Sequence, residues 1–374
     1  MGLPLVHLTG SPYAQGAAHG ETLRAAIAHN LALYFDRFER EAKLAPDEAL
    51  ARARRYADAI AARDPDYHAG MRGIADGAGQ PLDRIAALNV RYEILYYQFG
   101  QNATAVRNPD GCTAFAIAPE ASANGHLLLG ENWDWIPEVR GALLHTVEAD
   151  GFAVLAFTEA GIFGGKIGLN SAGLGLVING MTTTGDDWSR LSRPFHARCR
   201  AILRARDIDA ATAIITAAPR ACAANFLLAQ TPDRIVDIEA APDRARSWTA
   251  EGGRLCHTNH FLAPRALGVV EPEIERGPDS QDRLDRMRVL LDVPRPLAFA
   301  DLAAALRDPA GAPDAICRHP DPTQPPEERY ATVVSVIMDL HAQTLAITDG
   351  PPDEREYETY ALATLRDPGG VFAR

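Results

Sequence analysis

Long apolar runs, basic clusters and paired cysteines are all missing from this sequence. No uncharged apolar stretch approaches the ~18 residues that would suggest a membrane-spanning helix. The first residues have neither the positive start nor the long apolar stretch of a secretory signal. The five cysteines are an odd number, widely spaced and without a CxxC pair, so a zinc ribbon and a redox dithiol have little support. Few, unpaired cysteines suit a reducing compartment, and we therefore expect a cytoplasmic protein.

The common nucleotide-binding and serine-hydrolase motifs are also missing. The formal net charge is −12 without a long run of Lys and Arg, which argues against nucleic acid and anionic membranes as partners. Gly161–Lys166 is followed by Ile167 in place of Ser or Thr, so a P-loop fails, and Gly173-Leu-Gly175 lacks the third glycine of a dinucleotide loop. No Gly-x-Ser-x-Gly elbow occurs. We expect neither a cofactor nor a metal ion.

The first hundred residues have the apolar spacing of helices. Apolar residues recur at three- and four-residue steps over Glu21–Glu41, and Ser11 followed by Pro12 predicts the N-terminal cap of that helix. Further helices are expected over Glu48–Ala61, Gly70–Ala78 and Leu82–Tyr97. Residues 1–111 therefore form a helical N-terminal segment that ends in a polar loop, which we expect to be exposed or strained.

From Cys112 onward, short apolar runs alternate with Gly, Asn and Asp turns, which is typical of antiparallel sheets. The expected strands are Thr113–Ala118, Leu127–Gly130, Ala142–Val147, Ala153–Thr158, Gly164–Leu169, Leu174–Asn179, Asn225–Gln230, Ile235–Glu239, Ala245–Thr249, Leu255–Thr258, Thr332–Leu340 and Thr344–Thr348, with helices at about 196–217, 280–292 and 299–306. Strands grouped with strands and helices grouped with helices indicate an α+β protein. In this protein residues 112–374 would form the core, and the whole chain would make one structural unit.

Cys112 lies at the junction of the two halves, directly after Gly111. A single buried cysteine is most often just a small apolar side chain. Here, however, the thiol could attack the carbonyl of Gly111 and convert the peptide bond into a thioester that water opens. Gly111 has no Cβ to obstruct that attack and permits unusual backbone angles, where strain of about 1–3 kcal/mol would favour the shift. The position therefore suggests self-cleavage of the Gly111–Cys112 bond.

Cleavage would give Cys112 both a thiol and a free α-amine. The ordinary pKa values of these groups are about 8.5 and about 7.7–8.0. The amine can therefore act as the base for its own thiol near neutral pH, as in other N-terminal nucleophiles. No separate histidine is required.

Several motifs, in the same order along nearly the whole chain, resemble the acyl-CoA:6-aminopenicillanic acid acyltransferase family, also called the C45 peptidase family of N-terminal nucleophile hydrolases. The motifs are Gly10-Ser-Pro-Tyr-Ala-Gln-Gly16 with His19-Gly20, Gly73-Ile-Ala-Asp-Gly-Ala-Gly79, Leu88-Asn-Val-Arg-Tyr-Glu93, Asn108-Pro-Asp-Gly-Cys-Thr-Ala-Phe115, Gly130-Glu-Asn-Trp-Asp-Trp135, His257-Thr-Asn-His-Phe261, Ile316-Cys-Arg318 and Val336-Ile-Met-Asp-Leu340. The resemblance implies an αββα sandwich of two antiparallel sheets and a precursor that cleaves itself before the cysteine.

The resemblance also implies roles for five side chains. Cys112 matches the nucleophile, and Asp134 matches the carboxylate that holds its α-amine. Asn259 matches the oxyanion-hole amide, and Arg318 matches a basic residue close to the nucleophile. Asn179 resembles a second oxyanion asparagine of the related bile-salt hydrolases. Two positions depart from the expected pattern, since Glu131 stands where those relatives carry Arg and Ala114 replaces a hydroxyl residue.

Each of these residues also has a plainer interpretation. Asp134 could cap a turn, Asn259 could be a turn residue, and Arg318 could be a surface side chain paired with Asp314 or Asp321. Trp133 and Trp135, which share one strand face opposite Asp134, could be core residues or could line a pocket. Cys256, His257 and His260 invite a zinc site, but their spacing is cramped and a strand would point the two histidines to opposite sides.

The sequence therefore predicts an enzyme with an acyl-Cys112 intermediate. Its partners would be a small-molecule acyl donor, an amide or a thioester, and water or an amine as acceptor. Water gives an amidohydrolase and an amine gives an acyltransferase, and the sequence does not separate the two. The two cleavage fragments would stay associated, and a homo-oligomer is an open possibility. The alternatives are a related cysteine hydrolase without internal cleavage and a non-catalytic binding protein on the same scaffold.

Overall fold

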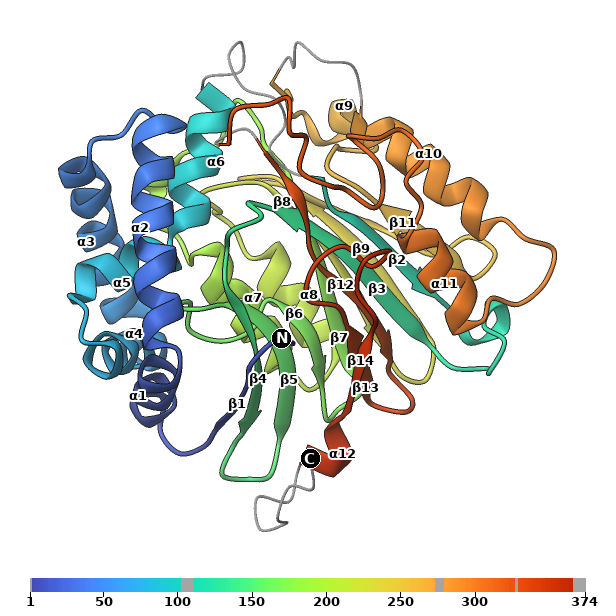
Figure 1. The fold of residues 1–374 in the computed structure, drawn as a ribbon, viewed down its shortest axis with the longest axis horizontal. Helices are drawn as coiled ribbons and strands as arrows, with labels where there is room; N and C mark the ends of the chain where they lie inside the picture. The colour runs from blue at the N-terminus through green and yellow to red at the C-terminus, as the bar shows by residue number, and fades with distance from the viewer. Residues whose placement is uncertain (1, 102–110, 273–278, 327–328, 366–374) are drawn as a thin grey trace.

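The computed structural model describes residues 2–101, 111–272, 279–326 and 329–365, and these build two stacked β-sheets between layers of helices (Figure 1). The larger sheet has the strand order β1-β4-β5-β6-β7-β8-β9-β10, and the smaller has the order β11-β2-β3-β12-β13-β14. The strands of the larger sheet are β1 (Leu5–Leu8), β4 (Gly141–Val147), β5 (Ala153–Glu159), β6 (Ile167–Asn170), β7 (Leu174–Gly180), β8 (Ala224–Gln230), β9 (Arg234–Ala240) and β10 (Ala245–Trp248). Those of the smaller sheet are β2 (Thr113–Ile117), β3 (Leu128–Trp135), β11 (Arg254–His257), β12 (Ala331–Asp339), β13 (Thr344–Ile347) and β14 (Glu358–Ala361).

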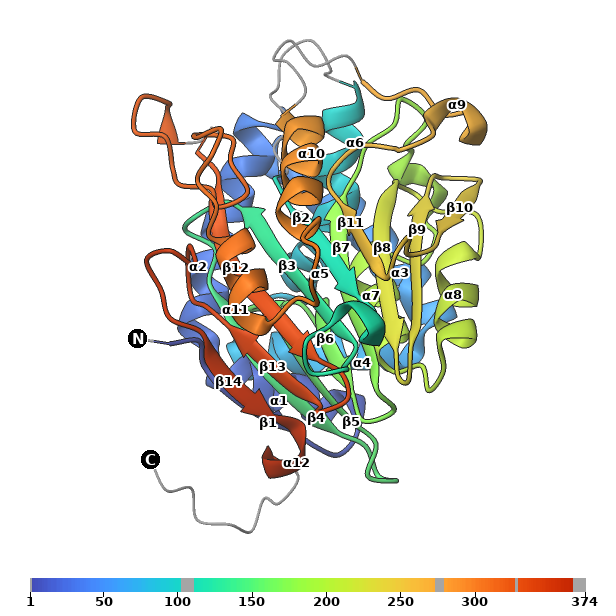
Figure 2. The same cartoon turned by 90° about the vertical axis from the view of Figure 1, so that its right-hand side faces the viewer.

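Helices cover the outer face of each sheet. On the side of the larger sheet lie α1 (Pro12–Thr22), α2 (Arg24–Arg40), α3 (Pro46–Arg63), α4 (Pro65–Ala78), α5 (Leu82–Asn89), α6 (Arg91–Gln101), α7 (Phe195–Leu203) and α8 (Ile208–Thr216). Figure 2 shows α10 (Asp279–Leu291) and α11 (Phe299–Leu306) in front of the smaller sheet. Two short helices, α9 (Pro264–Leu267) and α12 (Leu362–Leu365), complete the described part. The four layers confirm the predicted αββα arrangement.

Strand pairing is antiparallel as predicted, with one exception. β1, which the sequence did not predict, pairs in parallel with β4, so that Leu5 lies opposite Leu143. The first strand of the chain thus extends the larger sheet from its edge. β14 was also not predicted, and β3 continues five residues beyond the predicted Leu127–Gly130 strand, as far as Trp135. This longer β3 carries the Asn-Trp-Asp motif in regular strand geometry.

Three of the predicted helices are each divided in the structure. The predicted Leu82–Tyr97 helix is divided into α5 and α6, with the break at Val90. Ser11 caps α1, because its Oγ accepts a hydrogen bond from the amide of Ala14 at 3.2 Å, and a separate helix starts after the break at Leu23. The predicted cap of a Glu21–Glu41 helix is therefore wrong in its position. The predicted 196–217 helix is likewise two helices, and Asp207 caps the second by accepting from the amide of Ala210.

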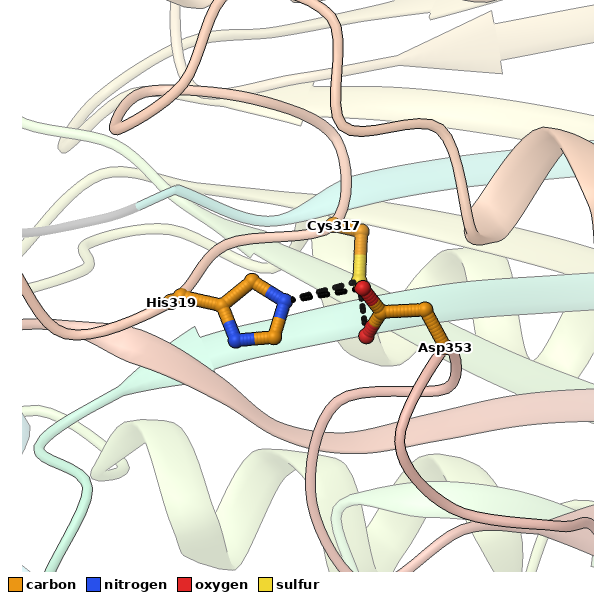
Figure 3. A group of neighbouring side chains, drawn as sticks. All are labelled: Cys317, His319 and Asp353. Carbon is orange, nitrogen blue, oxygen red and sulfur yellow. Dashed lines mark hydrogen bonds and ion pairs between the residues drawn. The ribbon is translucent and has the colours of Figure 1, made fainter.

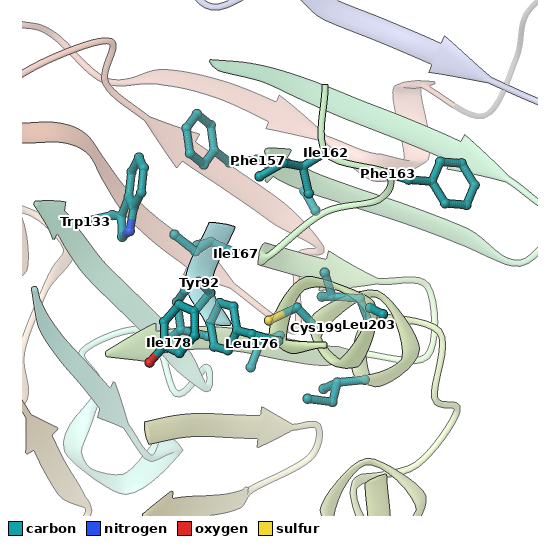
Figure 4. Close-up of a cluster of buried hydrophobic side chains, with 14 of the residues drawn as sticks. Tyr92, Trp133, Phe157, Ile162, Phe163, Ile167, Leu176, Ile178, Cys199 and Leu203 are labelled. Carbon is teal, nitrogen blue, oxygen red and sulfur yellow. The ribbon is translucent and has the colours of Figure 1, made fainter. Parts of the chain in front are cut away.

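The apolar core lies between the layers. Its largest part joins the helical N-terminal segment to both sheets. Figure 4 shows a portion of it that includes Tyr92 of α6, Trp133 of β3 and Leu176 of β7. A second apolar cluster lies between the smaller sheet and α10 and α11. None of the five cysteines, all of which lie in the described part of the chain, forms a disulfide. No helix among the described residues has both the length and the apolar character needed to cross a bilayer.

The helices α1 and α4 touch backbone to backbone through glycines. A Cβ on Gly16 would lie 2.1 Å from the carbonyl oxygen of Gly70, and a Cβ on Gly73 would lie 2.2 Å from the carbonyl oxygen of Tyr13. Backbone atoms in two helices cannot give way as the end of a flexible side chain can. Glycine is therefore required here by the close approach of the two helices.

We expect the substitution Gly73→Ala to destabilise the protein by about 1–3 kcal/mol or more, because the added methyl group forces α1 and α4 apart. Urea unfolding followed by circular dichroism measures the change. Gly185→Ala is the matched control, since the nearest atom to its added Cβ lies 3.7 Å away, at Thr183. Equal unfolding midpoints for the two variants would contradict this account of the helix contact.

Candidate active site

Cys112 lies immediately before β2, at the point where the helical segment joins the smaller sheet. β2 is an inner strand, paired with β11 on one side and β3 on the other. Cys112 Sγ lies 3.8 Å from the main-chain oxygen of Asp134, and the cysteine is 1% exposed. The sequence-predicted nucleophile and the Asn-Trp-Asp motif are therefore neighbours, and both are inside the protein.

The residue before Cys112 is enclosed by two charged side chains. Asp134 is fully buried; its Oδ1 accepts a hydrogen bond from Thr332 Oγ1 at 2.7 Å, and its Oδ2 lies 3.6 Å from Arg318 Nε. A Cβ on Gly111 would lie 2.6 Å from that Oδ2 and 2.7 Å from Arg318 Cζ. No larger residue fits at Gly111 without moving this ion pair. Gly111 is buried, so the expectation of an exposed junction is wrong at this residue, whereas 102–110 lie outside the described residues.

Arg318 is 4% exposed, so the interpretation of it as a surface residue is wrong. Its Nη2 lies 2.9 Å from Asp279 and 3.4 Å from Asp314, in addition to the contact with Asp134. Burial alone would lower the pKa of Arg318, but these three carboxylates outweigh burial and raise it. The backbone of Arg318 exchanges hydrogen bonds with Thr332 at the start of β12, which holds the guanidinium in place.

Arg283 of α10 connects the cysteine to Asn259, although no motif in the sequence predicted such a role for it. Its Nη1 donates to the main-chain oxygen of Cys112 at 2.7 Å and to Thr113 Oγ1 at 3.1 Å. Its Nη2 donates to Asn259 Oδ1 at 3.0 Å. Arg283 is 2% exposed, and burial lowers its pKa. The sequence does contain one indication of its role. Arg283 falls on the apolar face of α10 beside Leu284, and a charged residue is rarely buried unless it is paired.

The two asparagines lie at the end of β7. Asn259 Nδ2 donates to the main-chain oxygen of Gly180 at 3.1 Å, which places Asn259 beside the neighbouring Asn179. Asn179 is fully buried, and its Oδ1 accepts from Asn225 Nδ2 at 3.2 Å. Its Nδ2 has no hydrogen-bond acceptor within the described part of the chain. A buried amide N–H in this state is a donor that a bound group could use.

The structure thus places three of the five predicted site residues, Cys112, Asp134 and Arg318, in direct proximity, and it connects Asn259 and Asn179 to them through intermediate residues. Asp134 and Arg318 surround Gly111 on one side of the cysteine. Arg283 joins the cysteine to Asn259 on the other, and Asn179 follows through Gly180.

A fully buried ion cluster lies among the helices and the larger sheet. Glu159 of β5 accepts from the Arg91 guanidinium and lies 2.7 Å from Lys166 Nζ. Lys166 Nζ also lies 3.1 Å from the ring centre of Trp133. Burial lowers the pKa of Lys166 to about 8, although Glu159 opposes this shift. Trp133 and Trp135 share one strand face as predicted, and both are core residues that pack within this cluster.

Glu131, the departure noted in the sequence, connects the two sheets. It is fully buried on β3, and its Oε2 accepts a hydrogen bond from the amide of Ile178 on β7 at 3.0 Å. An arginine at this position could not accept that bond. The hydrogen bond to Ile178 therefore explains why this chain has glutamate where the related hydrolases have arginine.

The zinc interpretation of Cys256, His257 and His260 finds no support in the described residues. His257 Nδ1 is bonded to the Thr258 carbonyl and its Nε2 lies 3.2 Å from Glu239, while His260 Nδ1 lies 2.7 Å from Ser280 Oγ. The three residues do not converge on a common point.

A hollow of about 700 Å³ opens beside β11 and α10 and is lined by Cys256, His260, Gln281, Leu284 and Arg288 among others. Two of its lining residues, His260 and Leu284, are the sequence neighbours of Asn259 and Arg283, whereas Cys112 is not among the lining residues.

Two stacked sheets between helical layers are the architecture expected of the N-terminal nucleophile hydrolase fold. The model of the family described as acyl-coenzyme A:6-aminopenicillanic acid acyl-transferase matches residues 121–354, more than half of the chain. The chain belongs to this family of acyltransferases. The matched range begins after Cys112, so the match itself says nothing of the nucleophile.

A relative with a similar sequence agrees with this assignment. The acyl-coenzyme A:6-aminopenicillanic-acid-acyltransferase 40 kDa form of Emericella nidulans is 27% identical over 366 residues, which cover 96% of each chain. Among solved structures, a Caenorhabditis elegans N-acylethanolamine-hydrolyzing acid amidase ortholog has a TM-score of 0.45 at 15% identity, with 61% of this chain and 93% of that chain covered. Penicillin V acylase from Agrobacterium tumefaciens has a TM-score of 0.44 at 14% identity, with 64% and 83% covered.

Proposed function

We propose that the chain cleaves its own Gly111–Cys112 bond and then acts as an acyl-transferring enzyme with Cys112 as nucleophile. The observation that carries the proposal is the packing of Gly111 against Asp134 and Arg318, because it holds the peptide bond before Cys112 beside two charged groups in a buried site. Family membership supports acyl transfer as the type of reaction.

In the proposed cleavage, Cys112 Sγ attacks the carbonyl carbon of Gly111. The carbon–nitrogen bond breaks, the thiol proton passes to the departing amine, and Gly111 becomes a thioester on Sγ. Water then adds to the thioester, which releases the Gly111 carboxylate and restores the thiol. Asp134 is suited to hold the new ammonium group, since its carboxylate already lies next to Gly111 and a nearby anion favours the charged amine.

In the proposed turnover, the α-amine of Cys112 removes the thiol proton, and the thiolate attacks an N-acyl amide or an acyl thioester. The leaving amine or thiol departs with a proton, and water or an acceptor amine then takes the acyl group. Asn179 Nδ2 is available as a donor to the oxyanion, and Asn259 Nδ2 carries a second N–H besides the one that it donates to Gly180. One such donor typically contributes about 2.7–4 kcal/mol.

We propose Arg283 as a positioning residue for this reaction. It holds the main-chain oxygen of Cys112 and the side chain of Asn259 at the same time, so it fixes the nucleophile relative to the oxyanion donor. Arg318 has a different proposed role, which is to balance the charge of Asp134 and to stabilise an anion near the thiol.

The name of the Emericella relative, an acyl-coenzyme A-dependent acyltransferase, supports an acyl thioester as donor and an amine as acceptor. It does not extend to penicillin chemistry in this chain, since a shared site fixes the chemistry and leaves the substrate open. The other predictions remain proposals. They are a small-molecule acyl donor, water or an amine as acceptor, association of the two fragments, and a cytoplasmic location.

Intact mass spectrometry of the purified protein tests the processing step. We expect two fragments, residues 1–111 and 112–374, that elute together from a gel-filtration column under native conditions and separate under denaturing ones. A single full-length mass in a preparation that hydrolyses or transfers acyl groups would overturn internal cleavage and favour the cysteine hydrolase with an intact chain. A full-length mass without any activity would favour the binding-protein alternative.

A further inference from the structure

The side chains of Cys317, His319 and Asp353 converge on one another (Figure 3), and the first two are the sequence neighbours of Arg318. Cys317 Sγ lies 3.2 Å from Asp353 Oδ1 and 3.9 Å from His319 Nε2, and His319 Nε2 lies 3.0 Å from Asp353 Oδ2. One atom from each residue falls within 4.8 Å of the others. Sulfur, imidazole nitrogen and carboxylate oxygen are the three donor types that zinc takes in proteins.

The orientation of His319 is a second observation that points to a metal. Its Nε2 faces Cys317 and Asp353, while its Nδ1 lies 3.5 Å from Glu354 Oε1. A carboxylate on the outer ring nitrogen is the usual arrangement behind a histidine that binds zinc, because it fixes the ring and makes the inner nitrogen a better ligand.

The environment would let an ion enter and would hold it firmly. Cys317 is buried, whereas the side chains of His319 and Asp353 are about one-third exposed. The thiol now donates to Asp353, so its proton occupies the region between the donor atoms. A dication bound there would replace that proton and give Asp353 and the thiolate a common counter-charge.

We propose that Cys317, His319 and Asp353 bind a Zn²⁺ ion that fixes the loop carrying Arg318. Cys317 and His319 are the two neighbours of Arg318 in the chain, and their side chains meet on one side while Arg318 extends to Asp134 on the other. The ion would tie the loop before β12 to the loop after β13. Because the site is defined by its own geometry, it does not depend on the proposed reaction of Cys112.

Zinc titration of the full chain, treated with chelator and dialysed, tests the proposal in competition with a fluorescent zinc indicator. We expect one equivalent to bind, with release of about one proton per ion near pH 7, since the thiol must ionise. His319→Gln and Asp353→Asn should each weaken binding at least ~10-fold, and Cys317→Ser should also abolish the proton release. Zinc should raise the melting temperature of the unmodified chain and not that of the variants.

Two controls make the outcome decisive. His126→Gln removes a comparable histidine, one that lies 2.8 Å from Asp339 elsewhere on the surface, and should leave zinc binding unchanged. Cys112→Ala should also retain the site, because the ion is assigned to Cys317 and not to the proposed nucleophile. Equal zinc affinity in the unmodified chain and in His319→Gln and Asp353→Asn, or no binding at ~100 µM zinc, would overturn the proposal. Circular dichroism verifies that the variants are folded.

Discussion

Replacing Cys112 with alanine should leave the chain in one piece and lower acyl turnover by a factor of about 10³ or more. Both effects have the same cause, since one sulfur atom is proposed to attack the Gly111 carbonyl and later the substrate. Removing a covalent nucleophile costs at least this factor in other hydrolases, where the remaining rate comes from substrate binding and oxyanion stabilisation. Denaturing electrophoresis measures the first effect, and single-turnover assays with N-acyl amines and acyl thioesters measure the second.

Cys256→Ala is the matched control for this experiment. It removes a thiol of similar size from β11, the strand paired with β2, and should neither block cleavage nor lower turnover. Two bands from Cys112→Ala would show that cleavage is not autocatalytic. Undiminished turnover in an uncleaved Cys112→Ala variant would assign the reaction to another residue.

Removing the carboxylate of Glu159 should strongly destabilise the protein. Glu159→Ala leaves Arg91 and Lys166 buried without their shared counter-charge, and breaking a buried ion pair in this way costs about 3–5 kcal/mol. Burial would raise the pKa of Glu159, but the positive charges of Arg91 and Lys166 outweigh burial and lower this pKa well below its usual value. Its contribution should therefore be complete at neutral pH and be lost only in acid, below the usual pKa of a glutamate.

Urea unfolding at pH 7 measures this effect. Glu148→Ala serves as control, because Glu148 pairs with Arg204 at a partly exposed position where loss of the partner costs about 0–1 kcal/mol. A difference between the two variants of less than about 1 kcal/mol would mean that the buried charges find other partners. The same cluster contains Trp133 and Trp135, so a loosened core should also change tryptophan fluorescence.

The sequence allowed us to predict the four layers of the fold and the place of Cys112 before the first strand of the core, because alternating apolar runs indicate strands and the ordered motifs indicate the family. It could not show where a helix breaks. The chain turns at Leu23, where no glycine or proline marks the end of α1, so local propensity gave no signal. It also missed β1, a four-residue strand whose parallel partner begins more than a hundred residues later.

The site was predicted in part for a similar reason. Cys112 and Asp134 belong to recognisable motifs on adjacent strands, and strand pairing brings them together. Arg283 belongs to no motif, and its contact with Cys112 spans 171 positions of the chain. Likewise, Asp353 reaches Cys317 only through the hairpin of β12 and β13, so no local spacing could reveal the three-residue cluster. Long-range pairing of single residues is set by the fold and leaves little trace in sequence.

The parallel strand β1 has a consequence for any truncated form of this protein. A polypeptide starting at Cys112 would lack β1, and β4 would become an edge strand whose backbone is unpaired from Leu143 to Thr146. Exposed edge strands pair with strands of other molecules, which leads to aggregation. The first 111 residues therefore protect this edge of the sheet, and under the proposed cleavage they would have to be made together with the rest and stay bound to it.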